Sequence, residues 1–127
     1  MTEAAKPDRP NVLIVDDDPV NREIFRWALE PLCHLTERVN GIGVADHIRE
    51  TRPRVVFLDL MMPMVDGFEV IEELRTLAPD LLCRVVVVTA AMDHPKAEAI
   101  NAAGDVPIHL RPYDNADIVE LYQKYVQ

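Results

Sequence analysis

Residues 55–67 read VVFLDLMMPMVDG, and this stretch decides the fold class. It opens with an unbroken apolar run, Val55–Leu58, which has the length and composition of a strand covered on both faces. The run ends in a carboxylate, Asp59. Further along, Asp66 is followed three residues later by Glu69, the spacing of a capping box at the start of a helix. The stretch therefore predicts a buried strand, a loop and a helix, in that order.

Strand patterns recur on both sides of this stretch. Val12–Val15 and Val85–Val88 are further apolar runs that predict buried strands. Cys33–Val39 alternates apolar and polar residues, which is the pattern of a strand at a sheet edge with one wetter face. Val106–Leu110 predicts a weak fifth strand, because Pro107 is a poor strand former.

A stretch of helical periodicity follows each predicted strand. The first predicted helix ends at Pro31, the third opens at Asp66, and the fourth runs from about Asp93 to Ala103 and ends at Gly104. The predicted core-facing residues are, helix by helix, Val20, Ile24 and Trp27 with Phe25 and Ala28 beside them; Val44, Ala45 and Ile48; Val70, Ile71, Leu74 and Leu77; Ala97, Ile100 and Ala103; and Ile118, Leu121, Tyr122 and Tyr125. Five strand–helix units predict an α/β fold with a parallel sheet covered by helices on both faces.

Composition limits the function classes. The 127 residues fit one domain, and the net charge of −9 argues against non-specific binding to nucleic acid or to an anionic membrane. No secretory signal and no apolar run long enough for a bilayer is apparent, so a cytoplasmic location is predicted. Cys33 and Cys83 are expected to be reduced, buried thiols. Residues 1–10 are expected to form a disordered lead before a single domain over 11–127.

Polar residues stand where the predicted strands end. Asp16 and Asp17 follow the first run, Asp59 the third, Thr89 the fourth and Arg111 the fifth. In parallel sheets the functional crevice lies beyond the carboxyl ends of the strands, so these side chains should converge. Clustered carboxylates without His or Cys suit Mg²⁺, and a hydroxyl and a cation can hold phosphoryl oxygens. The set predicts phosphoryl transfer to a carboxylate nucleophile.

Each residue also has a simpler interpretation. An Asp after a strand is commonly a helix cap, and Asp18 before Pro19 is interpreted in that way. Thr89 could bond only to backbone, and Arg111 could be solvated. It is the coincidence of complementary groups at four strand ends that favours a functional site.

The chain resembles the bacterial receiver domains of two-component response regulators, chemotaxis-regulator-like proteins included, over residues 11–125. The matching motifs are Val-Asp-Asp at 15–17, Asp-Leu-Met-Met-Pro-Met-Val-Asp-Gly at 59–67, Thr-Ala at 89–90, Ala-Gly-Asp at 103–105, and a basic residue with Pro at 111–112. The resemblance implies a flavodoxin-like, doubly wound (βα)5 sandwich with strand order 2-1-3-4-5.

The resemblance also implies a role for each site residue. Asp59 would accept a phosphoryl group from a histidine kinase or a histidine phosphotransfer protein. Asp16, Asp17, Asp59 and the backbone carbonyl of Met61 would bind Mg²⁺, with Mn²⁺ as a substitute. Thr89 would contact the phosphoryl group in the active state. The Arg111–Pro112 peptide is expected to be cis.

Two positions depart from the family pattern. Arg111 replaces the family's lysine, and it could pair with Asp59 or Asp17 in the resting protein. Ile108 stands where the family usually has a switch Tyr or Phe, and Ile carries no ring. His109 is an alternative switch residue. Met61 and Ala91 are at positions that modulate the lifetime of the phosphorylated state in this family.

Three functions remain open from the sequence. The first is a phosphorylated switch that is not an enzyme beyond its own phosphorylation and dephosphorylation. It would signal to a protein partner through the fourth helix, fifth strand and fifth helix, as a monomer or weak dimer. The second is a degenerate receiver that binds partners without phosphorylation. The third is a Mg²⁺-dependent phosphatase, disfavoured because Met61 stands where that class has its second Asp. The end at Gln127 fits a stand-alone regulator or an excised domain.

Overall fold

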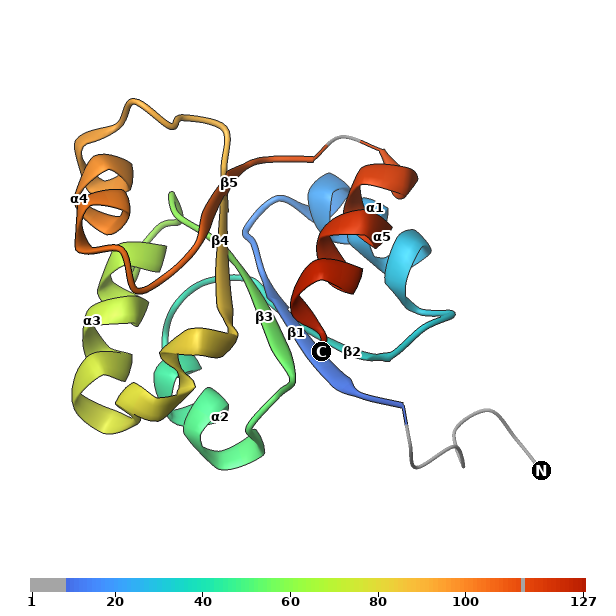
Figure 1. Cartoon of the computed structure of the whole chain (residues 1–127), viewed down its shortest axis with the longest axis horizontal. Coiled ribbons are helices and arrows are strands. Elements are labelled where there is room, and N and C mark those ends of the chain that lie inside the picture. The colour runs from blue at the N-terminus through green and yellow to red at the C-terminus, as the bar shows by residue number, and fades with distance from the viewer. Residues whose placement is uncertain (1–8, 113) are drawn as a thin grey trace.

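The computed structural model describes residues 9–112 and 114–127 (Figure 1). The predicted disordered lead falls outside this range, apart from Arg9 and Pro10. The elements follow the predicted alternation: β1 (Asn11–Val15), α1 (Pro19–Leu29), β2 (His34–Arg38), α2 (Val44–Thr51), β3 (Val55–Asp59), α3 (Gly67–Leu77), the 3₁₀ helix η2 (Pro79–Arg84), β4 (Val85–Thr89), α4 (Pro95–Ala103), β5 (Ile108–Leu110) and α5 (Asn115–Tyr125).

The five strands form one parallel sheet in the order β2-β1-β3-β4-β5, which confirms the expected topology. Helices α1 and α5 cover one face, and α2, α3 and α4 cover the other (Figure 1). Successive residues of a strand point to opposite faces, so Leu13 and Val15 enter one core while Val12 and Ile14 enter the other. Edge strand β2 is half-buried, as its alternation predicts.

Side-chain caps begin the helices α1, α3, α4 and α5. Asp18 accepts a hydrogen bond from the Val20 amide, as predicted for a cap without a metal role. Asp66 and Glu69 form the predicted capping box at α3. Gly104 ends α4 with φ of 74°, a left-handed conformation that glycine adopts without steric cost. These caps place the loops that follow β1 and β3 at the carboxyl end of the sheet.

Some predicted core faces were wrong. In α1, Trp27 is 66% exposed and Val20 is 60% exposed, whereas Phe25, Ala28 and Leu29 are buried. The two apolar stripes lie side by side on the helix, and contact with both the sheet and α5 selects one of them. Periodicity within a single helix cannot make that choice.

Two predicted core residues at helix ends are also exposed. Leu77, the last residue of α3, is 44% exposed, and Ala103 at the end of α4 is exposed as well. The unpredicted helix η2 explains Leu77, because its own residues Leu81 and Leu82 fill the adjoining core. Ala103 lies next to the short strand β5, which offers little surface to cover it.

The cysteines differ in burial. Both thiols are free, and Cys33 is buried as predicted, with a pKa that burial raises to about 11. Cys83 is exposed, so the prediction of a buried thiol was wrong there. It belongs to η2, where Leu81 and Leu82 take the inward positions.

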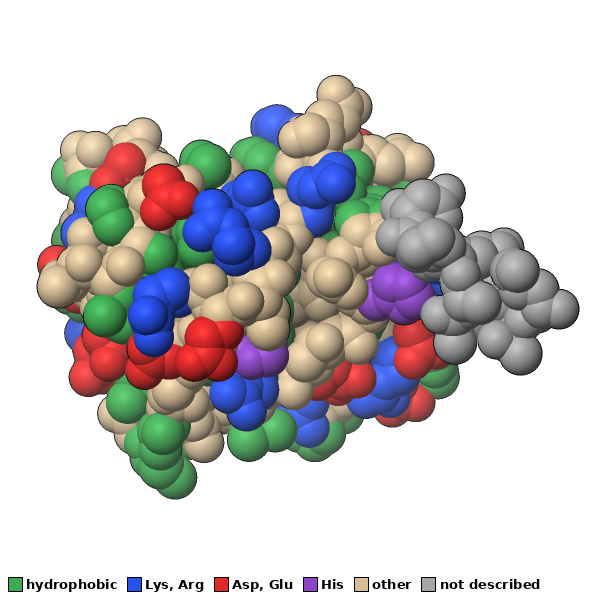
Figure 2. Space-filling model, turned by 90° about the horizontal axis from the view of Figure 1, so that it is seen from below, with side chains coloured by type: hydrophobic (Ala, Val, Ile, Leu, Met, Phe, Trp, Pro, Cys, Tyr) green, Lys and Arg blue, Asp and Glu red, His purple; other side chains and the backbone are tan. Residues whose placement is uncertain are grey.

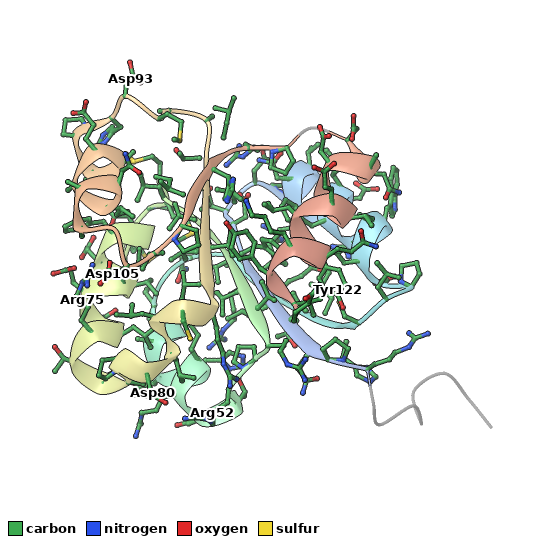
Figure 3. All side chains as sticks on the ribbon, in the orientation of Figure 1. Arg52, Arg75, Asp80, Asp93, Asp105 and Tyr122 are labelled. Carbon is green, nitrogen blue, oxygen red and sulfur yellow. The ribbon has the colours of Figure 1, made fainter. Side chains whose placement is uncertain are left out.

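Charged side chains tie the outer elements together. Arg75 of α3 pairs with Asp105 in the loop before β5, and Arg52 pairs with Asp80 of η2 (Figure 3). Figure 2, which views the end opposite the carboxyl ends of the strands, shows Lys and Arg side chains interspersed with acidic ones. Within the described ranges, each helix is too short or too polar to cross a lipid bilayer.

Candidate functional site

The polar strand-end residues meet at one mouth, as the sequence predicts. Asp16 follows β1, Asp59 and Thr89 are the last residues of β3 and β4, and Arg111 follows β5. The Arg111 amide donates to the Thr89 carbonyl at 2.8 Å, which holds the end of β5 beside β4. A cavity of about 430 Å³ opens here, lined by Asp17, Asp18, Pro19, Asp59, Met61, Thr89, Ala90, Ala91 and Arg111.

Three carboxylates form a cluster in this mouth. Asp16, Asp17 and Asp59 each offer one oxygen, and these oxygens lie within 4.8 Å of one another. Asp16 and Asp59 are buried and Asp17 is exposed. Burial and mutual repulsion both disfavour the ionised forms of such groups. An added cation would relieve both effects.

The pKa values of the two buried carboxyls reflect this environment. Burial, followed by the negative charge of Asp16, raises the pKa of Asp59 to about 7, although Arg111 and the Met61 amide oppose the rise. Burial also raises the pKa of Asp16, against the opposing effects of the Asp18 amide and Arg111. Two groups whose pKa values are raised together mark this mouth as a candidate functional site.

Arg111 lies against the cluster. Its Nη2 atom is 3.0 Å from Asp59 Oδ1 and 3.6 Å from Asp16 Oδ2. Both contacts are ion pairs between the Arg111 guanidinium and a buried carboxylate. The sequence suggested pairing with Asp59 or Asp17; the structure bears out Asp59 and places Asp16, not Asp17, as the second partner.

Of the remaining predicted site residues, Thr89, Met61 and Ala91 line the same cavity as Asp59, and Ile108 does not. Thr89 is buried, and its hydroxyl accepts a hydrogen bond from the Ala91 amide at 3.1 Å, the backbone role that the sequence left open. Met61 lines the cavity, and its backbone amide lowers the pKa of Asp59. Ile108 is half-buried and packs on the core beneath α4.

His109, the alternative switch residue, lies on the other face of β5. Its Nε2 is 2.6 Å from the Tyr125 hydroxyl, and the two rings meet edge to face with centroids 5.5 Å apart. Burial lowers the pKa of His109, and Lys124 lowers it further. The residue therefore joins β5 to α5, away from the acidic mouth.

The predicted cis peptide was wrong. No peptide bond is cis among the described residues, so the bond between Arg111 and Pro112 is trans. The trans form of an X–Pro bond is favoured by about 0.5–1 kcal/mol, and the fold does not override that preference here.

Close backbone packing shapes the loop after Asp59. A Cβ on Gly67 would lie 2.4 Å from the Asp59 carbonyl oxygen, and the Gly67 amide donates to the Leu60 carbonyl at 2.9 Å. Only glycine fits this approach, which explains the Asp-Gly pair of the motif. Met64 has φ of 67°, an uncommon conformation for a residue with a side chain.

Two basic residues near the site were missed by the sequence reasoning. Arg22 of α1 donates to the Asp16 carbonyl at 2.8 Å while its Nε pairs with Glu37. Lys96 of α4 pairs with Asp66, the cap of α3. The ion pairs Arg22–Glu37 and Lys96–Asp66 join elements far apart in the chain, so no local spacing pointed to them, whereas Asp16 lies only six residues from Arg22.

Comparison with known proteins identifies the class. The chain belongs to the response regulator receiver domain family, whose pattern it matches over residues 12–123. It is 40% identical over 80 residues to the response regulator MprA of Mycobacterium sp. strain KMS, an alignment that covers 62% of this chain and 34% of MprA. The chain thus spans about a third of that relative's length.

Other relatives match along nearly the whole chain. An uncharacterized 14.6 kDa protein of Leptolyngbya boryana is 28% identical over 116 residues, covering 91% of this chain and 88% of that protein. The receiver domain of the putative response regulator NarL from Mycobacterium tuberculosis superposes with a TM-score of 0.72 at 27% identity, covering 93% and 96% of the two chains.

The receiver domain of the sensor histidine kinase PA1611 from Pseudomonas aeruginosa shares the fold. It superposes with a TM-score of 0.80 at 22% identity, covering 93% of this chain and 98% of that domain. That structure holds a magnesium ion in its active-site cleft.

Proposed function

We propose that this domain accepts a phosphoryl group on Asp59 from a phosphohistidine, in a Mg²⁺-dependent reaction, and signals by altered docking to a protein partner. The observation that carries the proposal is the setting of Asp59. It is buried and lines a cavity, clustered with Asp16 and Asp17 and 3.0 Å from the Arg111 guanidinium. This arrangement places a carboxylate nucleophile next to two further carboxylates and a positively charged guanidinium.

The chemistry follows from these groups. A carboxylate oxygen of Asp59 attacks phosphorus, the bond from phosphorus to the donor's imidazole nitrogen breaks, and an acyl phosphate forms. Catalysis of such transfers is mostly positioning and charge neutralisation. Arg111 supplies a permanent positive charge for phosphoryl oxygens, and the Thr89 hydroxyl, which accepts from the Ala91 amide, still has its own proton to donate.

The residues present fit a hard divalent cation. Asp16 Oδ2 is buried and accepts no hydrogen bond from the described residues, although it lies in the carboxylate cluster. All three side chains are oxygen donors, which suits Mg²⁺ or Mn²⁺. Asp16, Asp17, Asp59 and the Met61 carbonyl would hold the ion. When bound, the ion supplies charge neutralisation at the carboxylates and phosphoryl oxygens.

The donor, the output and the location are parts of the same proposal. A histidine kinase or histidine phosphotransfer protein in the cytoplasm would donate the phosphoryl group. The partner would dock on α4, β5 and α5, where a second cavity of about 440 Å³ is lined by His109, Leu110, Arg111, Pro112, Asp117, Glu120, Leu121 and Lys124. The domain would work as a monomer or weak dimer, and would catalyse only its own phosphorylation and dephosphorylation.

Labelling with a small phosphodonor tests the proposal. We expect acetyl phosphate and Mg²⁺ to add one phosphoryl group to the wild type, detected by intact mass and absent when EDTA is present during the labelling reaction. Asp59→Asn should take up none, whereas Asp80→Asn, an exposed carboxylate in η2, should label normally. Mg²⁺-dependent labelling that persists in Asp59→Asn would contradict the assignment of the acceptor.

A degenerate receiver remains the second candidate, because Arg111 already pairs with the acceptor and Ile108 lacks a ring. Such a domain would take no label from acetyl phosphate or from any kinase, yet would bind its partner equally well in the wild type and in Asp59→Asn. A partner whose affinity changes on labelling supports the switch.

A further inference from the structure

One nitrogen atom of Arg111 contacts both buried carboxylates of the mouth. Nη2 is 3.0 Å from Asp59 Oδ1 and 3.6 Å from Asp16 Oδ2, and the Arg111 side chain is only 17% exposed. Both carboxylates belong to the cluster in which one oxygen from each of three Asp side chains lies within 4.8 Å of the others. The guanidinium therefore lies beside two of the three carboxylates that a divalent cation would need.

Two arginines, Arg22 and Arg111, lie near the carboxylate cluster, and they differ in how directly they offset its negative charge. Arg22 also approaches Asp16, but it donates to the backbone carbonyl, and its Nε lies 3.3 Å from Glu37. Its charge is thus shared with a carboxylate outside the cluster. Arg111 is left as the cation paired directly with Asp16 and Asp59 among the described residues. A guanidinium cannot lose its proton in a protein, so this compensation is permanent.

We infer that Arg111 is an internal counter-ion that competes with the divalent metal for Asp16 and Asp59, so that metal binding moves the Arg111 guanidinium off these two carboxylates. The inference rests on the proposed function, since it deepens the metal dependence of the same site. It makes Arg111 a residue that sets metal affinity and not only a phosphoryl contact.

Arg111 has somewhere to go. Its Nε is buried without a hydrogen-bond partner in the described part of the chain, so the guanidinium is incompletely satisfied where it is. The backbone bond to Thr89 holds the residue but leaves its side chain free to rotate. Arg111 lines both the acidic mouth and the cavity between β5 and α5, so rotation would carry the guanidinium from the first toward the second.

This geometry couples the two cavities. If metal binding displaces Arg111, any ligand that favours Arg111 in the cavity beside α5 must favour metal binding by the same factor, because linkage is reciprocal. Such a coupling needs no aromatic ring on β5, where this chain has Ile108. The position of the Arg111 guanidinium would then depend on whether metal is bound in the mouth.

Calorimetric titration with Mg²⁺, repeated with Mn²⁺ by electron paramagnetic resonance, tests the competition. We expect Arg111→Gln to bind either ion at least about tenfold more tightly than wild type, since a positive charge a few ångströms from the ion is removed. Arg111→Lys should lie between the two, because its ammonium is flexible and bridges two carboxylates less well. Arg49→Gln, the same charge change on α2, should match wild type.

Unfolding without metal gives a second measurement. In EDTA, Arg111→Gln should unfold at a lower temperature than wild type, and Mg²⁺ should raise its midpoint by more than it raises that of wild type. A variant affected only structurally would lose stability without binding metal more tightly. If Arg111→Gln does not fold, Arg111→Lys alone decides the order.

Two failures are distinguishable. Equal or weaker Mg²⁺ binding by Arg111→Gln and Arg111→Lys, with binding still lost in Asp17→Asn, overturns the competition and leaves the metal site intact. Absence of binding that depends on Asp17 in every variant overturns the metal site itself, and the competition with it.

Discussion

The centre and the β5 edge of the sheet differ sharply in packing. All five residues of β3 are buried, whereas β5 has three residues, of which two are half-buried and Leu110 is exposed. The adjoining helices show the same contrast. Helix α3 buries Gly67, Val70, Ile71 and Leu74, while α4 buries only Ala97 and Ile100.

The difference assigns separate roles to the two regions. Asp59 ends the best-packed strand, so its carboxylate is held in place by the core, as a reacting group requires. Arg111 follows the least-packed strand, and regions with few buried contacts open at low free energy. In the ion pair between Asp59 and Arg111, the fixed residue comes from the centre of the sheet and the movable residue from its β5 edge.

Truncating a leucine in each region tests this contrast with the largest expected effect. Leu58→Ala in β3 should destabilise the domain by about 3–4 kcal/mol, because it leaves a cavity in a buried core. Leu110→Ala in β5, 58% exposed, should cost less than about 0.5 kcal/mol. Urea unfolding measures both. Similar losses at the two sites would remove the basis for the comparison.

The carboxylate cluster should make the centre sensitive to pH. The pKa of Asp59 rises on folding from 3.8 to about 7, so its contribution to stability is complete below 3.8 and is lost as the pH rises through about 7. Metal-free Asp59→Asn should therefore be more stable than wild type by roughly 2–3 kcal/mol near pH 8, and the gain should disappear near pH 4.

Thermal unfolding in EDTA across this pH range checks the prediction, with Asp80→Asn as the exposed control. Addition of Mg²⁺ should shrink the difference, because the ion compensates the same charge. A gain that stayed constant from pH 4 to pH 8 would show that Asp59 titrates normally.

The link between α3 and α4 should separate the two regions further. Asp66→Ala removes both the helix cap and the partner of Lys96, and should cost about 1–2 kcal/mol. Lys96→Met removes only the ion pair between the partly exposed Lys96 ammonium and Asp66, and should cost less than Asp66→Ala. Hydrogen exchange should quicken in α4 for both variants but in α3 for Asp66→Ala alone. Faster exchange in α3 caused by Lys96→Met would contradict the assignment.

The smallest effect is expected where β5 meets α5. Tyr125→Phe removes the hydroxyl that contacts His109 and should cost about 0.5–1 kcal/mol. His109 should keep its lowered pKa in this variant, since burial is the main cause. Its contribution to stability is present above pH 6.5 and is lost as the pH falls through the lowered folded-state value. Proton NMR of the His109 ring measures its pKa in wild type and in Tyr125→Phe. A pKa of 6.5 in the variant would make the Tyr125 hydroxyl the cause of the lowered pKa.

The sequence by itself determined the fold and which polar side chains meet at the carboxyl edge of the sheet. Apolar runs that each end in a polar residue predict both the buried strands and the edge at which Asp16, Asp59, Thr89 and Arg111 meet. Parallel strands bring their carboxyl ends to the same edge of the sheet. A polar residue that directly follows an apolar run is therefore expected at that edge. The Asp66–Glu69 capping box was predictable because its two residues are three positions apart at the start of one helix.

Only the tertiary structure decided which surfaces and partners these residues use. It buried Phe25 instead of Trp27, placed η2 under Leu77, and kept the Arg111–Pro112 peptide trans. It also paired Arg111 with both Asp59 and Asp16. These outcomes depend on packing and charge between segments far apart in sequence, and a pattern within one segment carries no information about them.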